Sequence, residues 1–328
     1  MIRQTVRDLP VPGAADLAIR DLPREIAVHD AHMATVPGMN LIETGGAAPG
    51  APLSLPLTVG AWNLERCLFP EASAVRARDC DLLLVSEMDH GMARTQQRNT
   101  TAALAGALGA AYAYAVEFLE LGLGSPIELQ FCDDGHNARG YHGNGLMARG
   151  ALHQPFALRL RGKRQWFFDA EQPRLGERIA VGARIETTDG PFLAVSTHLE
   201  SACGPEHRED QVAGLIAAID AEFPGLPVLI GGDLNTGNHN HGNWRAEGLF
   251  DVARAAGFSA HGGPEEQMTT RPSLITRWPD RAQKLDWFLA RGMTLGPVDI
   301  RPALDPSGGP LSDHDLIVAR IEALQHGA

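Results

Sequence analysis

Lysine is nearly absent from this sequence: only Lys163 and Lys284 occur among 328 residues, and arginine supplies almost all of the positive charge. The formal net charge is −12, and no basic run carries the interleaved aromatic residues that stack single-stranded bases. Proteins that hold long nucleic acid depend largely on neutralising its phosphates. The composition therefore argues against processive binding to long nucleic acid, although it is compatible with an arginine-lined cleft for a smaller phosphate.

Cysteine is scarce, and long apolar segments are missing. Four cysteines, at positions 67, 80, 132 and 203, show no CxxC spacing, so we expect free thiols in a reducing compartment rather than a zinc knuckle or a disulfide framework. The first 30 residues carry interspersed charges, no stretch is apolar for long enough to cross a membrane, and no lipidation signal is present. We therefore expect a cytoplasmic protein that does not bind membranes and has no evident obligate protein partner.

The remaining composition is that of a soluble globular protein, with 44% hydrophobic and 21% charged residues. Residues 1–55 are rich in Pro, Gly and Ala and lack sustained periodicity, which predicts an extended arm or an added edge instead of a separate domain. The main domain is expected to span residues 56–328.

Short apolar runs alternate with amphipathic segments over this domain. A helix is predicted over 208–223, where apolar residues recur at helical spacing, and another over 95–111. Strands are predicted at 57–62, 81–87, 145–148, 178–187, 191–198, 227–232, 284–290 and 314–321. Buried strands interleaved with helices indicate an α/β domain with packed sheets.

Polar side chains follow several of these strands at the point where each ends. Asp233 and Asn235 directly follow the apolar run at 227–232. Gly-Gly-Asp and Asn-Thr-Gly are good turn sequences, so a simple turn explains this position by itself. Alternatively, the two side chains face one small polar ligand. The same pattern recurs at other strand ends, with Asn63, Glu65, Glu87, His198, Asp286, Asp313 and His314.

Sites of α/β sheets are built at such strand ends. Any one of these residues could be a cap or a turn former, but six strand ends carrying acids, amides and imidazoles favour a shared site. Hard oxygen donors suit Mg²⁺, which retains several waters and takes few protein carboxylates. The set therefore predicts a site for one divalent cation and one phosphate.

The ordered motifs WNLE (62–65), SEMD (86–89), STHLES (196–201), GGDLN (231–235), KLDWF (284–288) and LSDHD (311–315) resemble the endonuclease/exonuclease/phosphatase superfamily, which includes deoxyribonuclease I. The resemblance covers roughly residues 57–322. It implies an α/β (α+β) fold in which two mixed β-sheets pack face to face with helices outside, a four-layer sandwich. It also implies that residues 56–328 form the catalytic domain.

The resemblance implies a Mg²⁺ cofactor, with Mn²⁺ as a substitute. Glu87 resembles the main metal ligand, with Asn63 beside it, Asp313 near a bound water and Glu65 in the outer shell. Glu117 matches a family position less securely.

The resemblance also implies the catalytic groups of an in-line hydrolysis by water. Asp233 resembles the residue that orients and deprotonates the water, and Asn235 the one that holds a phosphoryl oxygen or that water. His314 is expected to donate to a phosphoryl oxygen, oriented by Asp286. His198 is expected to be the second imidazole of the site; the alternative is a satisfied core histidine.

Three loops are expected to select the substrate. His239 and His241 follow Asn235 in a Gly/Asn-rich loop and could bind a second metal or a phosphate, or be solvated loop residues. The loops at 131–149 and 268–283 supply the other candidates for substrate binding, which are Asn144, His142, Arg139 and Arg277, with Arg271 and Arg281 nearby.

The predicted function is that of a metal-dependent phosphoric ester hydrolase acting on a phosphomonoester or phosphodiester of a small or medium-sized substrate, down to a short oligonucleotide. The alternative within catalysis is a nuclease acting on DNA or RNA. A catalytically inactive binding module on the same scaffold is a third hypothesis, which the complete set of acids and imidazoles disfavours.

Overall fold

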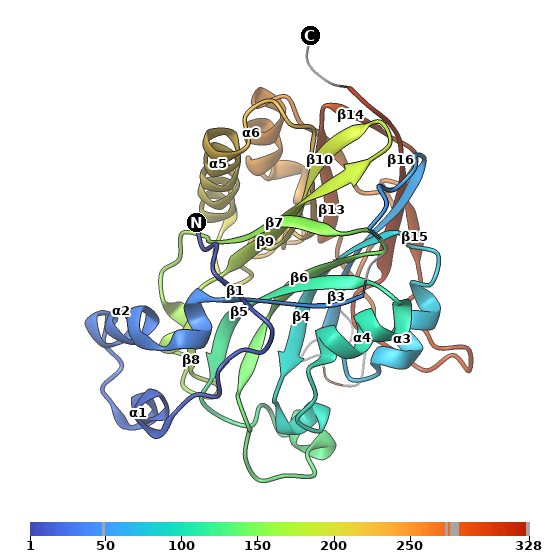
Figure 1. Ribbon diagram of the computed structural model, residues 1–328. Coiled ribbons are helices and arrows are strands. Elements are labelled where there is room, and N and C mark those ends of the chain that lie inside the picture. Colours follow the sequence, from blue (N-terminus) through green and yellow to red (C-terminus); the bar gives the residue numbers. More distant parts are fainter. Residues whose placement is uncertain (48–49, 273–274, 276–281, 326–328) are drawn as a thin grey trace.

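The computed structural model describes residues 1–47, 50–272, 275 and 282–325. Two mixed β-sheets lie face to face, and helices cover their outer faces (Figure 1). The predicted four-layer α/β sandwich is confirmed.

The larger sheet has ten strands in the order β1-β2-β5-β6-β4-β3-β16-β14, with β8 paired to β5 and β15 paired to β16. Its strands are β1 (Thr5–Val6), β2 (Ile42–Gly46), β3 (Leu57–Arg66), β4 (Leu82–His90), β5 (Ala111–Glu120), β6 (Tyr141–Ala148), β8 (Arg174–Gly176), β14 (Met293–Leu295), β15 (Asp299–Arg301) and β16 (Leu316–Leu324).

The smaller sheet has six strands in the order β12-β13-β11-β10-β9-β7. These strands are β7 (Leu152–Arg159), β9 (Ile179–Thr187), β10 (Gly190–His198), β11 (Val228–Asp233), β12 (Ser259–His261) and β13 (Asp286–Arg291). The parallel pair β10–β11 lies beside antiparallel neighbours, so the sheet is mixed.

Helices α5 and α6 cover the smaller sheet, and α3 and α4 cover the larger one on the opposite side of the molecule (Figure 1). The α-helices are α1 (Ala14–Leu17), α2 (Ile26–Thr35), α3 (Pro70–Arg76), α4 (Thr100–Leu108), α5 (Pro205–Glu222) and α6 (Leu249–Ala255). Among the described residues, short 3-10 helices lie at Ala18–Asp21, Pro37–Asn40, Ala93–Thr95, Glu128–Phe131, Gln165–Phe167 and Trp244–Ala246. In the described part of the chain, no helix combines the length and hydropathy of a membrane span.

The two sheets meet in a largely apolar layer. Leu84 of β4 packs against Leu229 of β11 and Phe288 of β13 in this layer. Gly231 lies where the sheets approach most tightly, because a Cβ at this position would meet Leu84 and Phe288 at 2.8 Å. The burial of nearly all residues of β3, β4 and β11 explains why these strands begin as continuous apolar runs. The strand ends of both sheets are thereby fixed close together.

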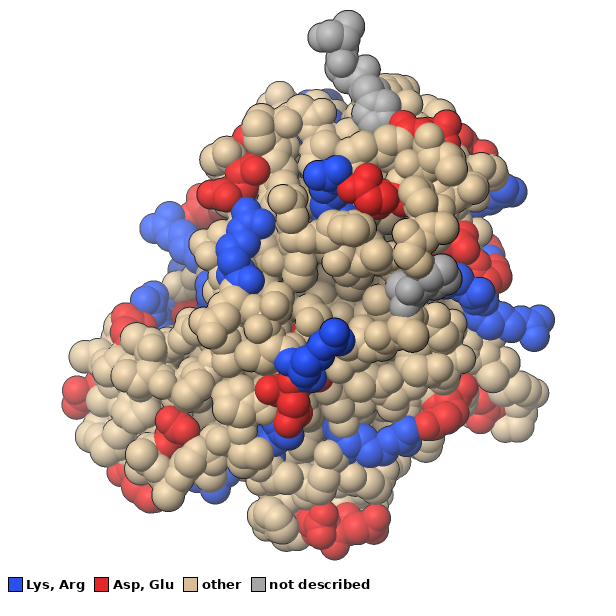
Figure 2. Space-filling model, viewed as in Figure 1, with Lys and Arg blue, Asp and Glu red and all other residues tan. Residues whose placement is uncertain are grey.

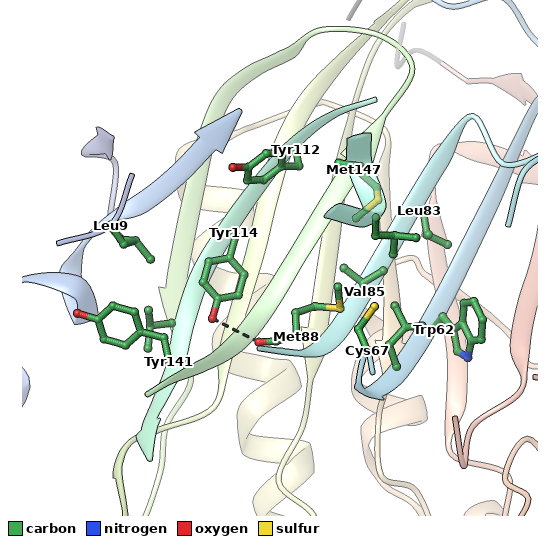
Figure 3. Close-up of a cluster of buried hydrophobic side chains, with 14 of the residues drawn as sticks. Leu9, Trp62, Cys67, Leu83, Val85, Met88, Tyr112, Tyr114, Tyr141 and Met147 are labelled. Carbon is green, nitrogen blue, oxygen red and sulfur yellow. Dashed lines mark hydrogen bonds between the residues drawn. The ribbon is translucent and has the colours of Figure 1, made fainter. Parts of the chain in front are cut away.

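A second apolar cluster covers the outer face of the larger sheet. Figure 3 shows Tyr112 and Tyr114 of β5, Tyr141 of β6 and Leu9 of the N-terminal segment at one side of this cluster. Trp62 lies at its other side and donates from its indole nitrogen to the carbonyl of His314 at 2.8 Å. The cluster thus holds the chain just before β16.

The predicted strands and the helix over 208–223 correspond to observed elements, with ends that differ by a few residues. The helix predicted over 95–111 is shorter, because it begins only after Asn99, whose side chain accepts a hydrogen bond from the Ala102 amide. It ends at Gly109, which has a φ of 65°. The chain then enters β5, which begins at Ala111. The sequence patterns do not predict this strand, and they assign Ala111 to the helix.

Residues 1–55 contain regular structure that their composition did not reveal. Strand β2 pairs with β5 in the larger sheet, and β1 adds beside it at the edge. Ile2 bridges to Ala157 of the smaller sheet, and α2 lies against β8. The segment therefore packs against both sheets instead of leaving the main domain.

Candidate active site

Three neighbouring strands of the smaller sheet place three candidate residues side by side. Asp233 is the last residue of β11 and lies in register with His198, the last residue of β10. On its other side it lies in register with Asp286, the first residue of β13. All three are at most 3% exposed. The strand pairing alone therefore gathers a carboxylate, an imidazole and a second carboxylate.

The larger sheet faces this row with its own polar residues. Asn63 of β3 donates from Nδ2 to Oδ2 of Asp233 and to Oε1 of Glu87, both at 3.1 Å. Nε2 of His198 and Nε2 of His314 each lie 3.6 Å from the same Oδ2 of Asp233. Asp233 is thus the meeting point of the two sheets, with two imidazoles and an amide around one oxygen.

His314 is oriented by Asp286. Nδ1 of His314 lies 2.8 Å from Oδ2 of Asp286. Burial opposes a charge on the imidazole, but the carboxylates of Asp286, Asp233 and Asp313 raise the pKa of His314 well above its ordinary value. Burial raises the pKa of Asp286 to about 6. At neutral pH the pair is therefore an imidazolium with a carboxylate, and Nε2 of His314 is a charged donor facing the site.

His198 has its own charged neighbours. Nη1 of Arg178 donates to Oε1 of Glu117 at 2.8 Å and lies 3.0 Å from Nδ1 of His198. Although burial opposes it, Arg178 and His198 lower the pKa of Glu117 to about 2. His198 lies between the Glu117–Arg178 pair and the carboxylate of Asp233. This geometry favours the second imidazole of the site.

Glu87 carries a contact that the sequence motifs did not predict. Nη1 of Arg66 forms a close ion pair with Oε2 of Glu87, and Nε of Arg66 donates to Oε1 of Glu128 at 2.9 Å. Despite the burial of Glu87, this guanidinium and then His198 and His142 hold its pKa well below the ordinary value. A cation therefore already lies at the carboxylate that resembles the main metal ligand.

Two more carboxylates lie beside Glu87. Glu65 accepts the backbone N–H of Asp313 at 2.8 Å, which ties the end of β3 to the loop before β16. Burial, together with the charges of Glu87 and Asp233, raises the pKa of Asp313. Clustered carboxylates repel one another, and a divalent cation relieves that repulsion. The donor set, three carboxylates and the Asn63 amide, fits a hard divalent ion.

The metal side of the site opens to a cavity of about 520 Å³. Trp166 lies on its wall and donates to both oxygens of Glu200 at 3.0 and 3.1 Å. The charged residues of the lining are six carboxylates and three arginines, namely Glu65, Glu87, Glu128, Asp169, Glu171, Asp313, Arg66, Arg174 and Arg178. Because carboxylates outnumber arginines in this lining, the cavity would repel an anionic substrate. A bound cation would offset that repulsion.

Asp233 and Asn235 diverge after the strand. Leu234 between them is fully buried in the apolar core. The backbone N–H of Asn235 donates to Oδ1 of Asp233 at 2.8 Å, its Nδ2 donates to the Leu199 carbonyl at 2.9 Å, and its Oδ1 accepts from Asn238. Asn235 thus shapes the turn and supports Asp233, and its predicted contact with a phosphoryl oxygen stays a prediction.

The candidates for substrate binding divide into two groups. His142 lines the cavity and contacts Oδ1 of Asp89 at 2.9 Å. Asn144 is fully buried, donates to the Ile179 carbonyl at 2.8 Å and has an Oδ1 without a hydrogen-bond partner.

The remaining candidates are not brought to this cluster. The guanidinium of Arg139 pairs with Asp8 and the Leu9 carbonyl, because the N-terminal segment crosses beside it. His239 and His241 are exposed in the loop after Asn238, and neither belongs to a group of metal-ligating side chains in the described part of the chain. Arg271 pairs with Asp315 at 3.2 Å. Arg277 and Arg281 lie outside the described residues.

Sequence reasoning missed Arg66, Arg178 and Glu128. Arg66 directly follows the WNLE motif, so its place on β3 could have indicated a role, but its pairing with Glu87 depends on the bulge between β3 and β4. Glu128 begins the short 3-10 helix Glu128–Phe131, whose sequence carries no signal of a site.

Comparison with solved structures identifies the fold. An endonuclease/exonuclease/phosphatase from Beutenbergia cavernae DSM 12333 is similar with a TM-score of 0.58 and 15% identity over 82% of this chain and 72% of that chain. One from Bacteroides vulgatus gives 0.53 and 19% over 81% and 98%. The catalytic domain of human Nocturnin, solved with a bound sulfate anion, gives 0.53 and 19% over 85% and 96%. No protein-family model and no curated protein matches the chain.

At identities of 15 to 19%, these likenesses define the fold. The chain has the endonuclease/exonuclease/phosphatase fold, and the resemblance seen in its motifs is confirmed at that level.

Proposed function

We propose that the chain is a metal-dependent phosphoric ester hydrolase of the endonuclease/exonuclease/phosphatase superfamily, with Mg²⁺ as its cofactor and a small or medium-sized phosphomonoester or phosphodiester as its substrate. The observation that carries the proposal is the convergence on Asp233 of Asn63, His198 and His314, from both sheets, next to the carboxylate of Glu87.

Asp233 is the base of this reaction. Its Oδ1 accepts a hydrogen bond from the backbone N–H of Asn235. Its Oδ2 faces Asn63 and the imidazoles of His198 and His314. A carboxylate oriented in this way takes a proton from a water and aims that water at phosphorus. With water activated by Asp233, hydrolysis needs no covalent enzyme intermediate. The water then attacks phosphorus directly, in line with the leaving oxygen.

His314 stabilises the charge that develops on the phosphoryl group. Asp286 holds Nδ1, so Nε2 is left to donate, and the raised pKa of His314 keeps that donor charged. A preoriented, buried donor costs little reorganisation during the reaction, and such donors are worth about 3–4 kcal/mol in mutational studies.

Glu87, Asn63, Asp313 and Glu65 would hold the metal ion. When bound, Mg²⁺ supplies a positive charge on the phosphoryl oxygens and neutralises the surrounding carboxylates. Arg66 must leave Glu87 for this to occur, and Glu128 offers it a second carboxylate to which it stays paired.

The charges around the site favour a small substrate. Six carboxylates face the cavity, and on the face shown in Figure 2 acidic and basic side chains are interspersed. A long polyanion needs a continuous basic track. Arg174, Arg178 and Trp166 line one wall of the cavity and suit a single further anionic or ring group of the substrate.

A panel of phosphoesters with and without Mg²⁺ tests the proposal. The panel contains p-nitrophenyl phosphate, bis-p-nitrophenyl phosphate, short oligonucleotides and plasmid DNA. We expect metal-dependent turnover of the small esters that exceeds turnover of plasmid per phosphate. Preferential cleavage of plasmid or long RNA would replace this proposal with the nuclease, and no turnover of any member would favour the binding module.

Two variants tie the activity to the site. Asp233→Asn and His314→Ala should each lower kcat by at least about 10²-fold, since each removes an acid–base or charged donor group. His241→Ala, in the exposed loop, is the matched control and should keep nearly full activity on the small esters. Near wild-type turnover by Asp233→Asn would contradict the assigned base.

A further inference from the structure

A second cluster of ligating side chains lies apart from the candidate active site. Asp8, Glu43 and His90 each offer one ligand atom, and these atoms lie within 4.8 Å of one another. They come from three separate parts of the chain: the N-terminal segment after β1, strand β2 and the last residue of β4. Nothing in the proposed hydrolysis uses them.

The imidazole of His90 has a buried nitrogen without a hydrogen-bond partner. His90 is 4% exposed, and its Nδ1 has no hydrogen-bond partner but points towards Oε2 of Glu43 at 3.5 Å. Its ring is packed edge-on against Tyr114 and Tyr141, with centroids 6.1 and 6.4 Å away. A buried polar atom without a partner costs free energy, so the missing partner at Nδ1 of His90 requires an explanation.

The carboxylate of Glu43 is held in place from three sides. Tyr112 donates its hydroxyl to Oε1 at 2.8 Å, the side chain of Asn99 donates to the same oxygen, and the Leu9 amide donates to Oε2 at 2.9 Å. Figure 3 shows Tyr112 and Leu9 on the same side of the sheet as Tyr114 and Tyr141. Metal-binding carboxylates are typically oriented by such outer hydrogen bonds.

We propose that Asp8, Glu43 and His90 form a binding site for a divalent transition-metal ion, with Zn²⁺ as the reference ion. One imidazole nitrogen with two carboxylate oxygens suits Zn²⁺ better than Mg²⁺, which prefers oxygen ligands alone. Ligands at about 2.1 Å in a tetrahedron lie roughly 3.4 Å apart. The observed 3.5 Å between His90 Nδ1 and Glu43 Oε2 matches that edge.

The third ligand closes the site from the solvent side. The Asp8 side chain is 69% exposed, and Nη2 of Arg139 lies 2.9 and 3.0 Å from its two oxygens. The ion would share Asp8 with Arg139 and join the N-terminal segment to β2 and β4. His90 follows Glu87 by three residues, roughly 10 Å along an extended strand, so this ion is separate from the catalytic one. Its role is to hold residues 5–9 on the sheet.

Zinc titration of the full-length protein tests the site. Isothermal titration calorimetry is run with saturating Mg²⁺ present throughout, on wild type, Asp8→Asn, His90→Ala and the control His153→Ala, which removes an exposed histidine from β7. We expect wild type and His153→Ala to bind equally, and Asp8→Asn and His90→Ala to bind one Zn²⁺ at least about tenfold more weakly. Zinc binding that persists unchanged in both variants is adventitious and overturns the proposal.

Two further measurements keep the test decisive if His90→Ala does not fold. Tyr112→Phe removes only a hydrogen bond to Glu43 and should weaken Zn²⁺ about tenfold while preserving the fold. Hydrogen exchange of the amides of residues 5–9 should slow on addition of Zn²⁺ in wild type but not in Asp8→Asn. Exchange that is insensitive to Zn²⁺ in wild type overturns the proposal, whatever the protein's phosphoesterase activity.

Discussion

Nδ1 of His314 lies 2.8 Å from Oδ2 of Asp286, although one residue lies just before a strand of the larger sheet and the other begins a strand of the smaller sheet. Asp286 begins β13 of the smaller sheet, and His314 precedes β16 of the larger one. The contact crosses from one sheet to the other at the candidate active site. It fixes which imidazole nitrogen of His314 faces Asp233.

Replacing the orienting carboxylate tests this pair. Asp286→Asn should lower kcat on bis-p-nitrophenyl phosphate by at least about 10²-fold, because the amide neither fixes the imidazole tautomer nor sustains its positive charge. KM should change less than about threefold. Steady-state kinetics provide the measurement, with the exposed Asp21→Asn as the control. A rise in KM alone, with kcat unchanged, would show that Asp286 contributes to substrate binding instead.

Removal of divalent ions should abolish turnover. After chelation with EDTA and desalting, activity is expected to fall below roughly 1% of its original value, because the clustered carboxylates then repel the substrate phosphate. Addition of Mg²⁺ or Mn²⁺ should restore it. Full activity in the thoroughly chelated protein would contradict the metal assignment.

Arg66 should compete with the metal ion for Glu87. Arg66→Gln removes a cation in direct contact with that carboxylate, so the protein should bind Mn²⁺ several-fold more tightly. Binding is followed by electron paramagnetic resonance of free Mn²⁺, independently of activity. The matched control is Arg20→Gln on the exposed surface, and weaker Mn²⁺ binding in Arg66→Gln would show that Arg66 supports the site instead of competing for it.

Arg94 is a buried structural cation. It is fully buried and donates to Asp89 at 2.8 Å through two nitrogens, to Glu120 at 2.7 Å and to Glu128 at 3.1 Å. Arg94→Met removes the shared cation from these three buried carboxylates and should reduce the free energy of unfolding by about 3–5 kcal/mol.

Urea denaturation at pH 7 measures this loss. Arg98→Met is the control, because Arg98 forms an exposed ion pair with Glu71, and such pairs contribute about 0–1 kcal/mol. Equal effects of the two substitutions would mean that Asp89 and its neighbours find other partners.

Glu177 should make stability fall as the pH rises. Burial raises its pKa from 4.5 to about 7. Between pH 4.5 and about 7 the Glu177 carboxyl loses its proton in the unfolded chain but keeps it in the native state. The free energy of unfolding therefore falls by about 3 kcal/mol as the pH rises through this range. Glu177→Gln should remove this loss and be more stable than wild type at pH 8.

Unfolding in urea at pH 5 and pH 8 measures the difference for Glu177→Gln and for the exposed control Glu25→Gln. An identical pH dependence for wild type and Glu177→Gln would show that the Glu177 carboxyl is not responsible.

The order of the motifs, and the strands that carry them, follow from local sequence patterns. The apolar run of Val228, Leu229 and Ile230 predicts a buried strand. Polar residues directly after such a run are expected at the end of the strand, where the chain leaves the core. The identities of Asp233, Asp286 and His314 therefore indicated a shared site before their geometry was known.

The contacts among these residues depend on strand pairing and on the packing of the two sheets. The pairing of β11 with β10 and β13 puts Asp233 between His198 and Asp286, and the packing of one sheet on the other brings Asn63 to the same oxygen. Arg139 has a typical phosphate-binding side chain, yet the N-terminal segment occupies it. Such contacts join residues far apart in the chain, and they depend on which strands pair and on how the two sheets pack, which local sequence patterns do not encode.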